Sequence, residues 1–173
     1  MGKNLDLQLW CARKKKEKFD IFKIEPVRKS VRKPMGGLWT STFTPDREYC
    51  SDWIEWCCSE MPEWVSGECY LIKPSNDVKV YEINSKEDFE NLYMKYPRNI
   101  KIGDYIHRGI DWEKVCKDYD AVHLTERGLS EIGTSLYGFE LWDVESTFWC
   151  RPKFSEIKHI SEVKDRKCKV ICD

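Results

Sequence analysis

The stretch Lys33-Pro34-Met35-Gly36-Gly37-Leu38-Trp39-Thr40-Ser41-Thr42 contains the most informative structural signals in the sequence. Paired glycines give the backbone a flexible turn and let it approach a neighbouring group closely. The run Leu38–Thr42 predicts a short strand that is entered through this turn. Its Trp and hydroxyl side chains form either a stacking and hydrogen-bonding surface for a ligand, or an ordinary strand with a buried Trp and solvated hydroxyls.

A second informative segment, Leu141–Cys150 (LWDVESTFWC), is predicted as one strand or as two strands joined by a kink. Asp143 and Glu145 are two residues apart, so in a strand both would point to the same face. Their neighbours are aromatic and aliphatic, and carboxylates are costly to bury in such surroundings. Two carboxylates held there are typical of a catalytic site. The alternative is an exposed strand face that carries acidic residues.

The remaining sequence interleaves strand and helix signals without a regular order. Strands are expected at 19–25, 68–73, 77–83, 119–124 and 169–172, with 68–73 and 77–83 forming a hairpin. Helices are expected to start at Asp52, Ser85 and Asp111 and to cover 155–163 at the surface. This mixture favours an α+β fold with a mixed or antiparallel sheet over a doubly wound fold.

Length and charge restrict the class of protein. The 173 residues fit one domain, residues 1–173, in which we expect 1–15 to be the loosest part. Hydrophobic residues make up 41% and charged residues 34%, so the chain is expected to fold. The net charge of −1 argues against general nucleic-acid binding. The eight Trp, eight Tyr and seven Phe indicate either a ligand cleft and interface or an aromatic core.

The nine cysteines are predicted to be free thiols in a cytoplasmic protein. Their number is odd, two of them are adjacent (Cys57 and Cys58), and the first residues lack the apolar run of a signal peptide. No stretch reaches the roughly 20 apolar residues of a membrane span, so we expect no membrane association. The spacing Cys168-x-x-x-Cys172 has only distant histidines as further ligands, so we expect no metal site.

Two segments together resemble a known family. Gly36-Gly37-Leu38-Trp39-Thr40-Ser41 and, about a hundred residues later, Trp142-Asp143-Val144-Glu145-Ser146 are similar to bacterial and phage ADP-ribosyltransferases. That group includes small phage anti-CRISPR enzymes, which modify a host protein using NAD. Phe22-Lys23 and Tyr119–Val122 resemble further strands of these proteins in order and approximate spacing.

The resemblance implies a split, mixed sheet flanked by short helices, with NAD in the cleft between its halves. It assigns the catalytic carboxylate to Glu145 or Asp143, which would stabilise the cationic ribose as nicotinamide leaves. The implied NAD-binding residues are Lys23, Arg28, Gly37, Trp39, Ser41 and Thr42. The family usually has Arg or His where Lys23 stands, and Lys lacks the bidentate fork of Arg, so Arg28 is an alternative. We expect Ser41 and Glu145 to lie within about 15 Å, the span of four to five extended residues.

The function that the resemblance implies is NAD-dependent transfer of ADP-ribose to a macromolecule, expected to be a host protein, with release of nicotinamide. Transfer to water alone stays open. Removal of a 2′-phosphate from RNA would need a cluster of basic residues, which is missing near the acidic segment. A third possibility is a non-catalytic phage or bacterial protein that inhibits a host protein through an aromatic surface. Both the ADP-ribosyltransferase and the non-catalytic inhibitor would fit a role in phage–host conflict.

Overall fold

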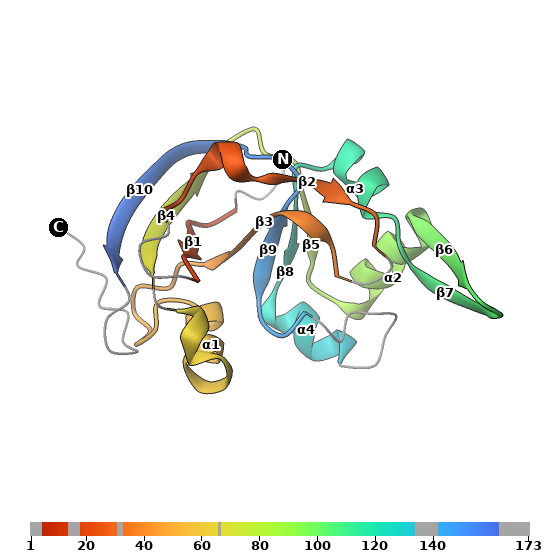
Figure 1. Cartoon of the computed structure of the whole chain (residues 1–173), viewed down its shortest axis with the longest axis horizontal. Helices are drawn as coiled ribbons and strands as arrows, with labels where there is room; N and C mark the ends of the chain where they lie inside the picture. The colour runs from red at the N-terminus through yellow and green to blue at the C-terminus, as the bar shows by residue number, and fades with distance from the viewer. Residues whose placement is uncertain (1–4, 14–17, 31–32, 66, 134–141, 163–173) are drawn as a thin grey trace. The chain divides into compact units, whose positions relative to one another are not determined.

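The computed structural model describes residues 5–13, 18–30, 33–65, 67–133 and 142–162. These residues form an α+β fold with a mixed sheet and, among them, four α-helices (Figure 1). They group into two compact units. Unit 1 comprises Met1–Lys23, Trp39–Val78 and Pro152–Asp173, and unit 2 comprises Ile24–Leu38 and Lys79–Arg151. The strand β3 (Met35–Thr42) therefore contributes its first half to unit 2 and its second half to unit 1.

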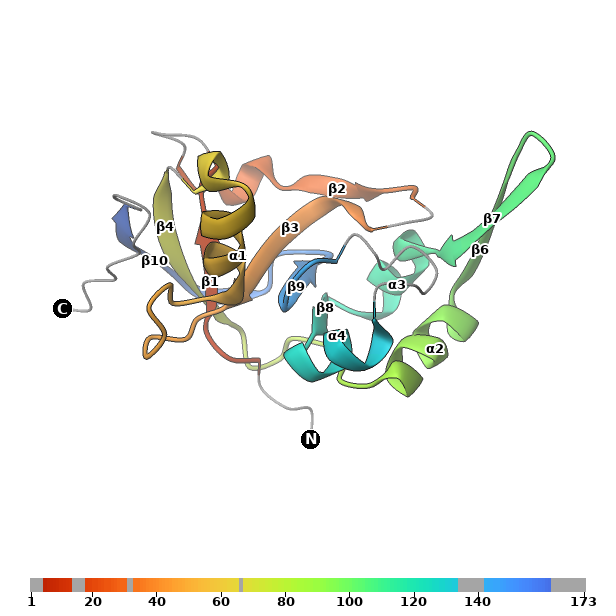
Figure 2. The ribbon, with the colours of Figure 1, turned by 90° about the horizontal axis from the view of Figure 1, so that it is seen from below.

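Unit 1 is built on an antiparallel sheet with the strand order β10-β4-β1-β3. Its other strands are β1 (Gln8–Cys11), β4 (Glu68–Pro74) and β10 (Phe154–Glu162). The helix α1 (Asp52–Glu60) covers β1 and β4 (Figure 2), and its buried Ile54 and Cys57 pack against Leu9 and Cys69. Two short 3-10 helices, η1 (Ile21–Lys23) and η2 (Pro62–Trp64), complete the unit.

Local signals explain where α1 begins and ends. The Ser51 hydroxyl accepts a hydrogen bond from the Ile54 N–H at 3.3 Å, which satisfies one of the free donors of the first turn. The capping residue is therefore Ser51, one residue before the expected Asp52, and Asp52 is the first residue of the helix. The helix stops at Met61, because Pro62 has no N–H to continue it.

Unit 2 contains the strand order β3-β9-β8-β5, with β2 (Glu25–Arg28) paired to β3 on its other side. The strand β8 (Ala121–Leu124) runs antiparallel to β9 (Ser146–Trp149) and parallel to β5 (Val80–Ile83), so this sheet is mixed. The helices of this unit are α2 (Lys86–Lys95), α3 (Trp112–Asp118) and α4 (Glu126–Ile132). A separate hairpin consists of β6 (Pro97–Ile102) and β7 (Tyr105–Ile110).

The core of unit 2 is aromatic. Trp112 of α3 packs edge-on against Phe148 of β9 at 6.1 Å between ring centroids, and against Trp142 at the same distance. Trp149 and Phe89 are also fully buried. Part of the aromatic excess in the sequence is therefore explained by packing, since each of these rings removes a large apolar area from water.

The paired glycines lie inside β3 rather than in a turn before it. Gly36 and Gly37 have φ angles of +78° and +60°, which residues with a Cβ rarely adopt. A Cβ on Gly36 would lie 2.1 Å from the Pro26 carbonyl oxygen of β2, and a Cβ on Gly37 would lie 2.5 Å from the Phe148 ring of β9. Close packing of β3 between its two neighbouring strands therefore accounts for both glycines.

Several expected elements differ from the structure. Residues 19–25 do not form a strand: Ile21–Lys23 is a 3-10 turn, and the strand starts at Glu25. The segment 155–163, expected as a helix, contains most of strand β10. The expected hairpin of 68–73 with 77–83 is also wrong, because β4 pairs with β1 and β10 whereas β5 pairs with β8. For 155–163 and for the expected hairpin, pairing with a distant strand decided the outcome.

The N-terminal region is more ordered than expected. Within residues 1–15, which were expected to be loose, Gln8–Cys11 forms β1 and pairs with both β3 and β4. Leu9 of this strand is buried in the core of unit 1. The sequence analysis also missed the β6–β7 hairpin and α4. The strand expected at 169–172 lies outside the described residues.

The expectation of free thiols throughout is wrong. Cys11 and Cys69 are direct partners in the β1–β4 register and form a disulfide. A second disulfide joins Cys116 of α3 to Cys150, which follows β9. An odd number of cysteines still allows two pairs, and the fold decides which residues meet. Disulfides are typical of oxidising compartments, so the cysteine count does not support the expected cytoplasmic location. Among the described residues, no helix is long and apolar enough to cross a bilayer.

Candidate functional site

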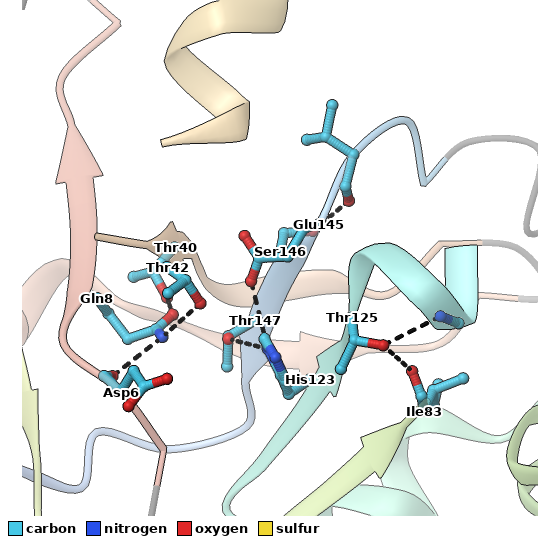
Figure 3. Close-up of polar contacts among 12 residues, drawn as sticks. Asp6, Gln8, Thr40, Thr42, Ile83, His123, Thr125, Glu145, Ser146 and Thr147 are labelled. Atoms are coloured by element: carbon cyan, nitrogen blue, oxygen red, sulfur yellow. Dashed lines mark hydrogen bonds and ion pairs between the residues drawn. The ribbon is translucent and has the colours of Figure 1, made fainter. Parts of the chain in front are cut away.

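The strongest candidate site in unit 2 is a buried pair formed by Glu145 and His123 (Figure 3). Nδ1 of His123 lies 3.4 Å from Oε1 of Glu145 and 2.9 Å from Oγ1 of Thr147. The two side chains of the pair are only 10% and 8% exposed. A charged group is costly to bury unless a partner stabilises it, and here the imidazole and the carboxylate supply polar partners for each other.

Strand pairing places these groups together. In the antiparallel β8–β9 register His123 is opposite Thr147, so the two side chains share a face of the sheet. In the parallel β5–β8 register Glu82 is opposite His123 on the other side. A polar row thus crosses three strands whose other residues are largely apolar. Glu145 precedes β9 by one residue and reaches His123 from the end of the strand.

The segment before β9 is anchored by its own contacts. The indole N–H of Trp142 donates a hydrogen bond to Oγ of Ser146, and this hydroxyl donates to the Val144 carbonyl oxygen at 3.2 Å. Trp142 is buried and packs against Trp112. These contacts hold the backbone on both sides of Glu145, so the orientation of its carboxylate is determined by packing as well as by His123.

Asp143 and Glu145 do not share a strand face as expected. Both precede β9, so the alternation of a strand does not apply to them. Asp143 is exposed, whereas Glu145 is buried. The structure therefore separates two carboxylates that the sequence left equivalent, because Glu145 is buried beside His123 whereas Asp143 is exposed.

The implied NAD-binding residues of unit 2 are Arg28 and Gly37. Arg28, in β2, forms an exposed ion pair with Glu25, three residues before it. Gly37 faces the Phe148 ring and the Trp149 carbonyl oxygen, each 2.5 Å from an ideal Cβ. Packing within the sheet is therefore sufficient to require glycine at position 37.

The implied NAD-binding residues of unit 1 lie in three different environments. Lys23 is 83% exposed in η1 and forms an ion pair with Asp20 at 3.5 Å. Trp39 is half-buried in β3, and Ser41 is opposite Leu9 and almost fully buried. Lys23 lies in a 3-10 turn rather than in the strand expected at 19–25, and Ser41 lies in the core, not on the solvated face that the alternative to a ligand site required.

Thr42 belongs to a buried polar network in unit 1 (Figure 3). Its Oγ1 accepts a hydrogen bond from Nε2 of Gln8 at 3.4 Å. The Thr40 hydroxyl donates to Oε1 of the same glutamine at 2.7 Å. Because Gln8 is fully buried, these bonds satisfy a side chain whose polar groups would otherwise be costly to bury. The hydroxyls of β3 thus have a structural role.

Of the two predicted catalytic carboxylates, Glu145 is the one that the structure brings into a buried polar cluster. Lys23, Trp39, Ser41 and Thr42 belong to unit 1, whereas Arg28, Gly37, Asp143 and Glu145 belong to unit 2. The expected cleft bordered by residues 37–42 and 141–149 stays a prediction. The first residue of the second of these segments, residue 141, lies outside the described residues.

The sequence analysis missed His123 as a partner of Glu145. A signal was present, since His123 is the polar residue within the apolar run Ala121–Leu124 (AVHL), and Thr147 is the polar residue directly before Phe148 and Trp149. Recognising the pair required the pairing of β8 with β9, which joins residues 24 apart in the chain.

The described residues contain no group of three or more histidine, cysteine and carboxylate side chains arranged to hold a metal ion, and the absence of a metal stays a prediction. Comparisons of the chain with protein-family models, with curated proteins and with solved structures found no match.

Proposed function

We propose that the chain transfers ADP-ribose from NAD to a side chain of a host protein and releases nicotinamide. The observation that carries this proposal is the buried Glu145 carboxylate beside His123, within the segment that resembles the acidic strand of ADP-ribosyltransferases. Asp143, the other candidate from that resemblance, is exposed. We therefore assign the essential carboxylate to Glu145.

The chemistry requires stabilisation of positive charge. The bond between C1′ of the nicotinamide ribose and the pyridinium nitrogen breaks, and the nitrogen keeps the electron pair, so nicotinamide leaves as a neutral molecule. Positive charge then develops on the ribose. A carboxylate with little water around it stabilises this charge more strongly than an exposed one, because screening by solvent is reduced. The acceptor side chain bonds to C1′ and releases its proton to solvent or to a base.

His123 and Thr147 would serve as positioning residues in this reaction. A single ring nitrogen of His123, Nδ1, contacts both the Thr147 hydroxyl at 2.9 Å and the Glu145 carboxylate at 3.4 Å. His123 lies in β8 and Thr147 in β9, which are hydrogen-bonded to each other, so the imidazole ring has a rigid support. Rigid support matters because a misplaced stabilising group loses much of its catalytic effect.

The test is incubation of the full-length chain with NAD labelled in the adenylate part, with and without a bacterial lysate. We expect nicotinamide release together with label on a lysate protein, and we expect both to be lost in Glu145→Gln. Nicotinamide release without transfer would identify water as the acceptor and contradict the transfer step. If the folded parent neither releases nicotinamide nor transfers label, the proposal is wrong and inhibition by binding alone becomes the better hypothesis.

A further inference from the structure

Three tryptophans gather on α1 and η2 of unit 1. The ring centroids of Trp53 and Trp56 are 5.3 Å apart, with planes inclined by only 19°. Trp64 lies 6.1 Å from the first ring and 6.2 Å from the second. All three are half-buried and pack against the core cluster of the unit. Part of each ring therefore remains at the surface, in a cluster of aromatic faces.

A cation already occupies this cluster. The guanidinium carbon of Arg13 lies 4.5 Å from the ring centroid of Trp64 and 5.9 Å from that of Trp53. Both distances are within the range in which the negative face of an aromatic ring attracts a cation. Arg13 follows β1 by two residues and is exposed. The cluster thus accepts an arginine side chain from a surface segment of polypeptide.

The charge around the cluster is acidic. The sequence 51–65 contains Asp52, Glu55, Glu60 and Glu63 and no Lys or Arg. Asp52 is paired with Arg47, whereas the three glutamates are exposed. Burial raises the pKa of the neighbouring Cys57 thiol to about 12. The positive charge of Arg13 lowers this pKa, and the negative charge of Glu63 raises it further. Arg13 and Glu63 therefore both act on the region around α1.

We infer that Trp53, Trp56 and Trp64 form a binding site for an arginine side chain of a partner protein, and that Arg13 occupies this site while the partner is absent. Arginine fits better than lysine because its planar, weakly hydrated guanidinium stacks on aromatic faces. The exposed glutamates favour a partner segment that is basic overall. This inference does not depend on the proposed reaction with NAD.

The test compares the full-length parent with Arg13→Ala. The probe is the peptide acetyl-Gly-Arg-Gly-amide, and the matched control peptide has citrulline, which is neutral and almost the same shape. Binding is followed by titration with detection of the indole N–H resonances. We expect Arg13→Ala to bind the arginine peptide about tenfold more tightly than the parent does, because the internal competitor is gone. We also expect it to prefer arginine over citrulline about tenfold.

Two further variants locate the binding. Trp64→Leu in the Arg13→Ala background should lose the preference for arginine, whereas Trp10→Leu, in a separate aromatic cluster with Phe19 and Tyr70, should keep it. If Trp64→Leu does not fold, Glu63→Gln replaces it and should weaken binding of the arginine peptide about threefold at low salt, with a smaller salt dependence.

Some results would overturn the inference. One is equal binding of the arginine and citrulline peptides to Arg13→Ala. Another is a lower melting temperature of Arg13→Ala without any gain in peptide binding, which would show that the Arg13 contacts only stabilise the fold. An unchanged preference in the folded Trp64→Leu or Glu63→Gln variant would place the binding elsewhere. None of these results bears on cleavage of NAD.

Discussion

At the scale of single residues, two carboxylates that are neighbours in sequence have different physical environments. Asp143 is exposed, so water screens its charge, whereas Glu145 is buried beside His123. The same charge has a stronger effect on a reacting group when screening is weak. Burial therefore distinguishes the two residues as candidates for stabilising a cationic transition state.

Replacing these carboxylates by amides tests the assignment. We expect Glu145→Gln to lower kcat for nicotinamide release about 100- to 1,000-fold with little change in the Kd for NAD, because the interaction is made mainly in the transition state. Asp143→Asn is the matched substitution, and we expect it to stay within about twofold of the parent. Rates, NAD binding and melting temperatures of the three proteins are measured side by side.

A Glu145→Gln variant that cleaves NAD as fast as the parent would show that Glu145 has no catalytic role. A variant that is inactive and also melts at a much lower temperature than the parent would instead point to a structural role of the Glu145–His123 pair. His123→Gln helps to separate these cases, since a positioning role predicts a smaller loss of kcat than the loss in Glu145→Gln.

At the scale of elements, β3 shows how a strand depends on its neighbours. It contains two glycines with positive φ, each in contact with an adjacent strand at a distance that leaves no room for a side chain. Glycine normally weakens a strand because it has no side chain to pack. Here the absence of a side chain lets β2 and β9 approach β3, which is a gain in packing that the sequence alone does not reveal.

The contribution of this packing is measurable by comparing Gly37→Ala with Gly103→Ala. Both glycines have φ of +60°, but a Cβ on Gly103 meets nothing within 4 Å. We expect Gly103→Ala to lower the free energy of unfolding by about 1–2 kcal/mol through backbone strain alone. Gly37→Ala should cost about 1–3 kcal/mol more, because its Cβ overlaps Phe148 and the Trp149 carbonyl group. Equal losses in urea unfolding would show that the sheet relaxes around the methyl group.

At the scale of the whole molecule, each unit contains one described disulfide. Cys11–Cys69 joins β1 to β4 in unit 1, across 58 residues of sequence. Cys116–Cys150 joins α3 to the end of β9 in unit 2, across 34 residues. Closing loops of this length restricts the unfolded chain and is worth about 4 kcal/mol for each crosslink. Cys57 is a buried free thiol.

Thiol counting tests this arrangement. Of nine cysteines, at least four are in disulfides, those of the described residues, so denatured but unreduced protein should show at most five reactive thiols, and reduced protein should show nine. Reduction should lower the melting temperature, and Cys116→Ser should abolish part of this effect. In the native protein Cys57 should be alkylated slowly at pH 8, because burial raises its pKa to about 12 and little thiolate forms. Nine thiols without reductant would contradict both pairs.

The sequence by itself determined the features that depend on neighbouring residues. The helices expected near Asp52, Ser85 and Asp111 exist, because capping side chains and apolar spacing act within a few residues. The α+β class follows from the same local signals. The segment Leu38–Thr42 forms a strand, as its composition indicated. The residue Glu145 was also a candidate on sequence grounds, although its partner and its burial were not known.

Only the tertiary structure decided the features that depend on distant residues. The strands β1 and β10 were missed because four to nine residues with an irregular pattern become strands only when a neighbouring strand offers hydrogen bonds and apolar contacts. The pairing of Cys11 with Cys69 and of His123 with Thr147 follows from strand register, which local sequence does not specify. The difference between Glu145 and Asp143 has the same origin, because burial is a property of what packs around a side chain.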